Sequence, residues 1–185
     1  MHASRQIKRM SPLKMDGKEK DLLQDLAIKK AISWKNNYIV LLEKINLTLY
    51  PCRAWALFLQ EVGGKRDEKY VFSIGRIYGS KALEIIKKRI NELKFNLPEH
   101  YQTFPAFVEI SGVGKIKTLE EDKEVRIIFN NHATLNHSLE RYKEKAMAPS
   151  FYAGILTEFY NSFFMKKIVF KPLVENGEVV FTAKK

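Results

Sequence analysis

A chain of 185 residues with 45% hydrophobic side chains is long enough to bury the core of one domain without covalent cross-links. Its single cysteine, Cys52, excludes a disulfide framework, and the absence of any apolar run of about 18 residues predicts no membrane span. Residues 1–20 are charged rather than apolar, so they do not resemble a secretory signal, and we expect a cytoplasmic, basic protein.

The excess positive charge lies mostly at the two ends of the chain. Residues 1–20 hold 6 basic and 2 acidic side chains (+4), and residues 164–185 hold 5 and 2 (+3), which leaves +4 of the total +11 for the residues between them. A domain that binds nucleic acid usually gathers its cations on a folded face, whereas charged ends also serve solubility. Nucleic-acid binding through the basic ends therefore remains an alternative that the sequence does not favour.

The N-terminal part of the chain predicts an arm followed by a helix. Residues 1–17 lack regular apolar spacing and are interpreted as a flexible basic arm, whereas residues 18–185 are interpreted as a single α+β domain. Apolar residues recur at helical spacing from Lys18 to about Trp34. Several of them spread over more than one stripe, which predicts a homodimer that pairs through this helix, with packing of the helix on its own domain as the alternative: Leu22, Leu23, Leu26 and Ile28.

Two more helices are expected before the middle of the chain. Residues 38–42 form a short apolar run that indicates a strand or an extended segment. Pro51 suits the first position of a helix, which we expect to end at Gly63-Gly64. A long helix should then cover about Asp67 to Lys94.

This long helix contains two glycines four residues apart, Gly75 and Gly79, and a second small pair, Ala153-Gly154, lies near the far end of the chain. A glycine inside a helix costs about 1 kcal/mol relative to alanine. The spacing therefore indicates close approach of another backbone or of a ligand on that face. Since the neighbouring side chains are aromatic and aliphatic, we expect an apolar pocket beside the glycines.

Beyond residue 100 the pattern changes towards strands. Residues 106–110 and 124–129 are rich in branched and aromatic side chains and predict strands, with a charged connection at 119–123. Residues 130–148 show no clear period.

A helix is expected from Pro149 to Phe164, followed by a hairpin of residues 167–171 and 178–182 around the turn Asn176-Gly177. Helices that precede most of the strands predict an α+β fold, with helices packed on an antiparallel sheet of about four strands.

Three stretches together resemble the four-vinyl reductase (hydrocarbon-binding) domain, and more distantly the Bet3-like subunits of the Golgi tethering complex. They are the glycine helix at residues 72–79, the strand and polar turn at 125–131, and the glycine-containing helix at 150–158. The likeness spans roughly residues 20–185. It implies a ligand-binding domain of the NO-signalling and Golgi-transport type.

The chain departs from this family where the family often holds zinc. Members often carry a cysteine just before the last helix and two more in the terminal hairpin. The corresponding segments of this chain, residues 145–148 and 173–181, contain no cysteine. His132 and His137 are five apart, which does not fit ligands on one helical face. We therefore expect no metal and no cofactor.

The aromatic residues of the expected helices have two interpretations. They either form an ordinary core or line a cavity beside the glycines, with Arg76, Tyr78 and Tyr152 as its polar groups. Arg76 could meet a carboxylate head group or point to solvent. The candidate pocket comprises nine residues: Trp55, Phe58, Phe72, Gly75, Arg76, Tyr78, Gly79, Tyr152 and Gly154.

The sequence contains no phosphate-binding glycine loop, dinucleotide fingerprint or nucleophile elbow. We therefore expect a binding or sensor module without catalytic activity, whose ligand is an apolar or amphiphilic small molecule or a lipid. A dimeric scaffold or protein-interaction subunit is the alternative, and a nucleic-acid-associated regulator is a further one.

Overall fold

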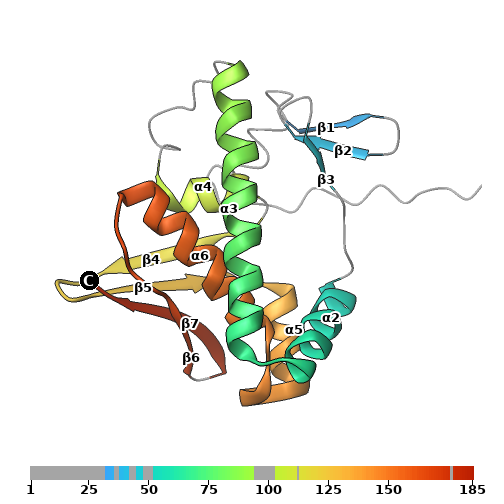
Figure 1. Ribbon diagram of the computed structural model, residues 1–185, viewed down its shortest axis with the longest axis vertical. Coiled ribbons are helices and arrows are strands. Elements are labelled where there is room, and N and C mark those ends of the chain that lie inside the picture. The colour runs from blue at the N-terminus through green and yellow to red at the C-terminus, as the bar shows by residue number, and fades with distance from the viewer. Residues whose placement is uncertain are drawn as a thin grey trace, which may run out of the picture.

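The computed structural model places two long helices, α3 and α6, over one face of a four-stranded antiparallel sheet (Figure 1). This arrangement confirms the predicted α+β fold. The structure describes residues 32–35, 38–41, 45–47, 52–93, 103–111, 113–175 and 177–185.

The four-stranded sheet has the order β4-β5-β7-β6, and every neighbouring pair is antiparallel. In β5, Val125, Ile127 and Phe129 are buried and alternate with half-buried residues, because successive side chains of a strand point to opposite faces. The same inner face includes Phe181, which is paired with Ile127. The strands are β4 (Ile116–Glu120), β5 (Glu124–Phe129), β6 (Lys171–Glu175) and β7 (Glu178–Lys184).

Helix α6 lies between the sheet and α3 and forms the centre of the core. Its Tyr152 ring contacts Phe129 of the sheet, and its Tyr160 hydroxyl is hydrogen-bonded to Glu120. Residues 148–157 of α6 are all buried, because α3 covers the side that faces away from the sheet. The helical elements are α2 (Cys52–Lys65), α3 (Glu68–Leu93), α4 (Phe104–Ile110), α5 (Ala133–Tyr142), the short 3-10 helix η2 (Lys143–Lys145) and α6 (Ala148–Phe164).

The glycines mark the line along which α3 and α6 touch. A Cβ atom at Gly75 would overlap the carbonyl oxygen of Phe151, and one at Gly154 would overlap the carbonyl oxygen of Phe72. A Cβ at Gly79 would lie 3.1 Å from the Cα of Ile155. The notch in α3 is therefore occupied by the backbone of α6. Of the two possibilities that the glycine spacing indicated, another backbone or a ligand, the first is the one observed.

The prediction of a strand at residues 106–110 is wrong, because this segment belongs to helix α4. Pro105 lies in its first turn, where the missing N–H costs least. Phe104 packs on Tyr160, and Phe107, one turn later, packs on Phe159. The segment is buried on more than one side, which hides its helical period in the sequence.

Other segments also differ from their predicted structure. The charged connection expected at 119–123 overlaps the end of β4, a strand that the sequence analysis does not predict. Residues 130–148, which show no period, contain α5 and η2. The first strand of the terminal hairpin is Lys171–Glu175 rather than 167–171, because side chains of α6 bind the backbone of Ile168 and Phe170 before the strand begins. The turn is at the expected place, with Gly177 at a φ of +82°.

The N-terminal part of the chain contains a small sheet that the sequence did not predict. It has the antiparallel order β1-β2-β3, with β1 at Ile32–Lys35, β2 at Tyr38–Leu41 and β3 at Ile45–Leu47. The strand alternative for residues 38–42 is confirmed, but the expected helix cannot extend to Trp34. Its other residues and the arm at 1–17 lie outside the described residues.

Helix α2 also differs slightly from its prediction, because it includes Gly63 and Gly64 and ends at Lys65. No helix in the described part of the chain is long and apolar enough to cross a bilayer.

Candidate functional site

Several aromatic side chains from separate elements meet where α2, α3 and α6 come together. Trp55 of α2 stacks on Phe58 at a centroid distance of 5.2 Å and meets the edge of Phe151 at 5.5 Å. Tyr78 of α3 contacts the same Phe151 at 5.7 Å. We call this group, together with Tyr152 and His132 beneath it, the aromatic junction.

Tyr152 lies at the base of the aromatic junction. Its ring meets Phe151 at 5.4 Å and His132 at 4.5 Å, in both cases edge to face. Burial is the main reason that the pKa of its hydroxyl is raised to about 12, and the side chains of Thr134 and Trp55 are its hydrogen-bonding neighbours. The hydroxyl is therefore protonated at neutral pH and offers a buried polar group in an aromatic environment.

The hydrogen bonds of His132 fix its tautomer. The N–H of Leu135 donates to Nδ1 at 3.4 Å, and Nε2 lies 2.9 Å from the carbonyl oxygen of Val113. Because a carbonyl oxygen only accepts, Nε2 carries the hydrogen and the ring is neutral. Burial lowers the pKa of His132, which agrees with this assignment. The ring thus caps the N-terminus of α5 and forms a wall of the junction.

The outer side of the aromatic junction is open to solvent. Phe58 and Tyr78 are each 50% exposed, whereas Tyr152 is 7% exposed. Trp55, half-buried between them, connects the exposed rings to the buried ones. An apolar molecule that approached α2 and α3 would therefore meet aromatic surface first and the Tyr152 hydroxyl behind it.

The structure brings together four of the nine predicted pocket residues: Trp55, Phe58, Tyr78 and Tyr152. Gly75, Gly79 and Gly154 lie in the contact of α3 with α6, and half-buried Phe72 packs against the core. Sequence reasoning missed Phe151 and Thr134, and it did not include His132 among the nine pocket residues. The adjacent aromatic pair at 151–152 was a usable signal, but the cap formed by His132 becomes visible only once α5 is known.

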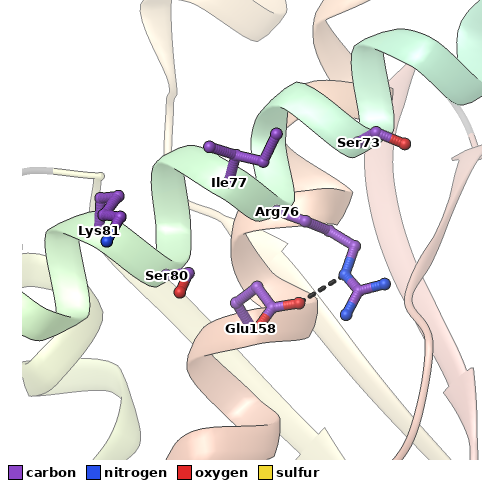
Figure 2. A pocket seen from close by; sticks show the side chains of 6 residues that line it. All are labelled: Ser73, Arg76, Ile77, Ser80, Lys81 and Glu158. Carbon is purple, nitrogen blue, oxygen red and sulfur yellow. Dashed lines mark hydrogen bonds and ion pairs between the residues drawn. The ribbon is translucent and has the colours of Figure 1, made fainter.

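Arg76 lies apart from the aromatic junction, on the wall of an open groove between α3 and α6. Figure 2 shows its guanidinium turned towards Glu158, and Nε lies 2.5 Å from the carboxylate oxygen Oε1. The groove has a volume of about 440 Å³ and is lined by Ser73, Arg76, Ile77, Ser80, Lys81 and Glu158. Because Arg76 is already paired with Glu158, a ligand carboxylate would have to compete for it.

A second hollow of about 250 Å³ lies at the start of α6. Met147 lines it together with Pro172 and Val174 of the terminal hairpin, so the two segments where the family resemblance implies zinc ligands do meet here. Their side chains offer no thiolate or imidazole, the usual ligands of zinc. Throughout the described residues, no group of three or more histidines, cysteines and acids could hold a metal ion.

Comparison with known proteins gives a likeness of fold. The chain is similar to the phenol-responsive sensory domain of the transcription activator PoxR, whose crystal structure contains phenol, with a TM-score of 0.62 and 16% sequence identity. The match covers 92% of this chain and 91% of the other. No family model matches the sequence, and no curated protein matches it either.

Proposed function

We propose that this protein is a non-catalytic sensor module that binds a small apolar or amphiphilic molecule at the aromatic junction. The observation that carries the proposal is the fold shared with a phenol-responsive sensory domain over 92% of the chain. Fold alone does not define an activity. The composition of the aromatic junction also supports the proposal, because small-molecule sites are mostly apolar with a few placed polar groups.

The same proposal includes membership of the four-vinyl reductase type of ligand-binding domain. Its support is the resemblance of residues 72–79, 125–131 and 150–158, together with the helices on an antiparallel sheet that this resemblance implies. A protonated hydroxyl at Tyr152 would donate to or accept from a polar group on an otherwise apolar ligand.

Native mass spectrometry of the purified protein, before and after denaturation, tests whether a ligand is carried. Fluorescence with selective excitation of tryptophan then tests the site, because the chain has two tryptophans and Trp34→Phe leaves Trp55 as the only one. In that background, titration with phenol and with decanoic acid should change the Trp55 emission for at least one of the two. No co-purified ligand and no response to either probe would contradict the proposal.

A matched pair of variants locates the binding site. Tyr152→Phe removes a buried hydroxyl inside the aromatic junction, whereas Tyr160→Phe removes one that is bound to Glu120 elsewhere on α6. We expect Tyr152→Phe to weaken binding of the responding probe by about fivefold, since a hydrogen bond contributes about 1 kcal/mol. Tyr160→Phe should leave the affinity within about twofold. Equal effects of the two variants would place binding outside the junction.

A dimeric scaffold is the second candidate function. It is favoured by the outer surface of α3, where Tyr70, Ile77 and Ile85 are exposed, Ile77 by 64%. Isolated apolar residues on a surface are common, but three on one helix can form part of an interface. The oligomeric states of the variants Leu26→Glu and Ile77→Glu, compared in the Discussion, test whether α3 forms such an interface.

A further inference from the structure

The loop after α6 exposes an apolar side chain at a position that favours glycine. Met165 follows the last residue of α6 with φ 53° and ψ 42°, the left-handed conformation in which helices usually place glycine or asparagine. Its side chain is 87% exposed. Neither the backbone conformation nor burial explains a methionine at this position. We therefore expect this side chain to serve a purpose other than stabilising the fold.

Side chains of α6 hold this loop in place. The Asn161 amide donates to the carbonyl oxygen of Ile168 at 2.8 Å, and its Oδ1 accepts from the Ile168 N–H at 2.9 Å. The N–H of Phe170 donates to Thr157 Oγ1 at 3.0 Å. Ile168 and Phe170 are therefore fixed in the core, and Val169 between them is turned outward, 54% exposed.

Two phenylalanines give the loop an apolar base. The rings of Phe163 and Phe164 pack on Phe104 of α4 at centroid distances of 5.7 and 5.6 Å, yet each side chain keeps more than a third of its surface exposed. These rings are anchored on one side, and Met165 and Val169 follow them in the chain with exposed side chains. We call these four residues the tip patch: Phe163, Phe164, Met165 and Val169.

Lysines adjoin the tip patch along the chain and from α3. Lys166, Lys167 and Lys171 are exposed, and Lys87 reaches from α3 to within 2.6 Å of the Ser162 hydroxyl. The sequence contains no acidic residue between Glu158 and Glu175, and Glu158 is paired with Arg76. The segment from Phe163 to Lys171 therefore combines exposed apolar side chains with an excess of positive charge.

We propose that the tip patch docks on the surface of an anionic lipid bilayer. Met165 and the neighbouring apolar side chains would enter the interfacial layer, while the lysines contact anionic headgroups. Charge complementarity between the lysines and anionic headgroups selects this partner. The contact is peripheral and independent of the aromatic junction.

Sedimentation with vesicles tests this inference on the full chain. The protein should sediment with vesicles of phosphatidylcholine mixed with phosphatidylserine at low ionic strength, and much less with phosphatidylcholine alone or in high salt. Lys166→Glu combined with Lys167→Glu should weaken the partition by at least about tenfold. The control, Lys143→Glu with Lys145→Glu, makes the same change of net charge at the other end of α6 and should weaken it less than about threefold.

Met165→Gly separates lipid contact from folding. Glycine suits the left-handed conformation, so the melting temperature should be equal or higher, while the partition to anionic vesicles should fall by about threefold or more. Absence of sedimentation with phosphatidylserine vesicles would overturn the proposal. Equal sedimentation of the parent and both tip variants would also overturn it, because the contact would then lie elsewhere, for example at the basic N-terminal residues.

Discussion

At the scale of single residues, His132 links the start of α5 to the aromatic junction. Its Nδ1 satisfies an N–H at the helix N-terminus, and its Nε2–H is bound to Val113 while the ring lies against Tyr152. Both ring nitrogens are in use, and protonation of Nδ1 would break the cap. The neutral form of one side chain therefore stabilises a helix and a wall of the proposed binding site together.

This arrangement predicts a pH dependence of stability. The pKa of His132 is lowered in the folded chain, so between that value and 6.5 the unfolded chain binds the extra proton. The free energy of unfolding should therefore be fully retained above pH 6.5 and should fall as the pH decreases below it. NMR titration should give His132 a pKa below 6.5, and urea unfolding at several pH values should show the loss.

The control for this prediction is His132→Asn. Asparagine also caps helices but does not titrate, so the variant should show a weaker decrease of stability with falling pH. At pH 7.5 it should be less stable by about 1–2 kcal/mol, because the bond to Val113 is lost. A pKa of 6.5 or above for His132 in the parent would contradict the assignment of a buried neutral ring.

At the scale of elements, the crossing of α3 and α6 depends on glycine. The backbones of the two helices lie so close at Gly75 that a methyl group would collide with the carbonyl of Phe151, which is backbone and cannot rotate away. Gly75→Ala should lower the free energy of unfolding by about 1–3 kcal/mol or more, because the helices must separate. Thermal or urea unfolding measures the change.

Gly64 is the matched control for this substitution. It also lies within a helix, and a Cβ there would meet no atom within 4 Å. Gly64→Ala should therefore stabilise the protein by about 0.5–1 kcal/mol, since alanine is the better helix former. If both alanine variants were more stable than the parent, the close approach of α3 and α6 would be wrong.

Elements with a strong local signal are the ones that the sequence predicts well. Helix α6 has a proline at its start and a long apolar run, β5 alternates, and Gly177 marks the hairpin turn, so all three lie where they are expected. Helix α4 and strand β6 were misplaced because tertiary contacts decide them. Phe104 and Phe107 are buried against α6, and Asn161 binds the segment that would otherwise begin the strand.

The same distinction applies to the candidate site. Aromatic side chains on expected helices indicated Trp55, Phe58, Tyr78 and Tyr152, which do lie in the aromatic junction. The ion pair of Arg76 with Glu158 joins residues far apart in the sequence, so no local sequence pattern predicts it. A pocket was expected beside the glycines, but spacing alone could not tell a ligand from the backbone of a second helix.

At the scale of the whole molecule, the exposed apolar surface bears on assembly. The sequence predicts a homodimer through the apolar residues at 22–28, which lie outside the described residues, whereas the structure adds the exposed face of α3 around Ile77. Symmetric dimers are the commonest oligomers of soluble proteins. Light scattering of the purified chain should therefore report about twice the chain mass of 21.6 kDa.

Two charge substitutions locate the interface of this predicted dimer. A carboxylate buried in an apolar interface without a partner is costly, so Leu26→Glu should reduce the measured mass to that of one chain. Ile77→Glu should leave the mass unchanged if residues 22–28 form the interface. The reverse pattern would assign the interface to α3 and favour the scaffold function, and a monomeric parent chain would contradict the dimer altogether.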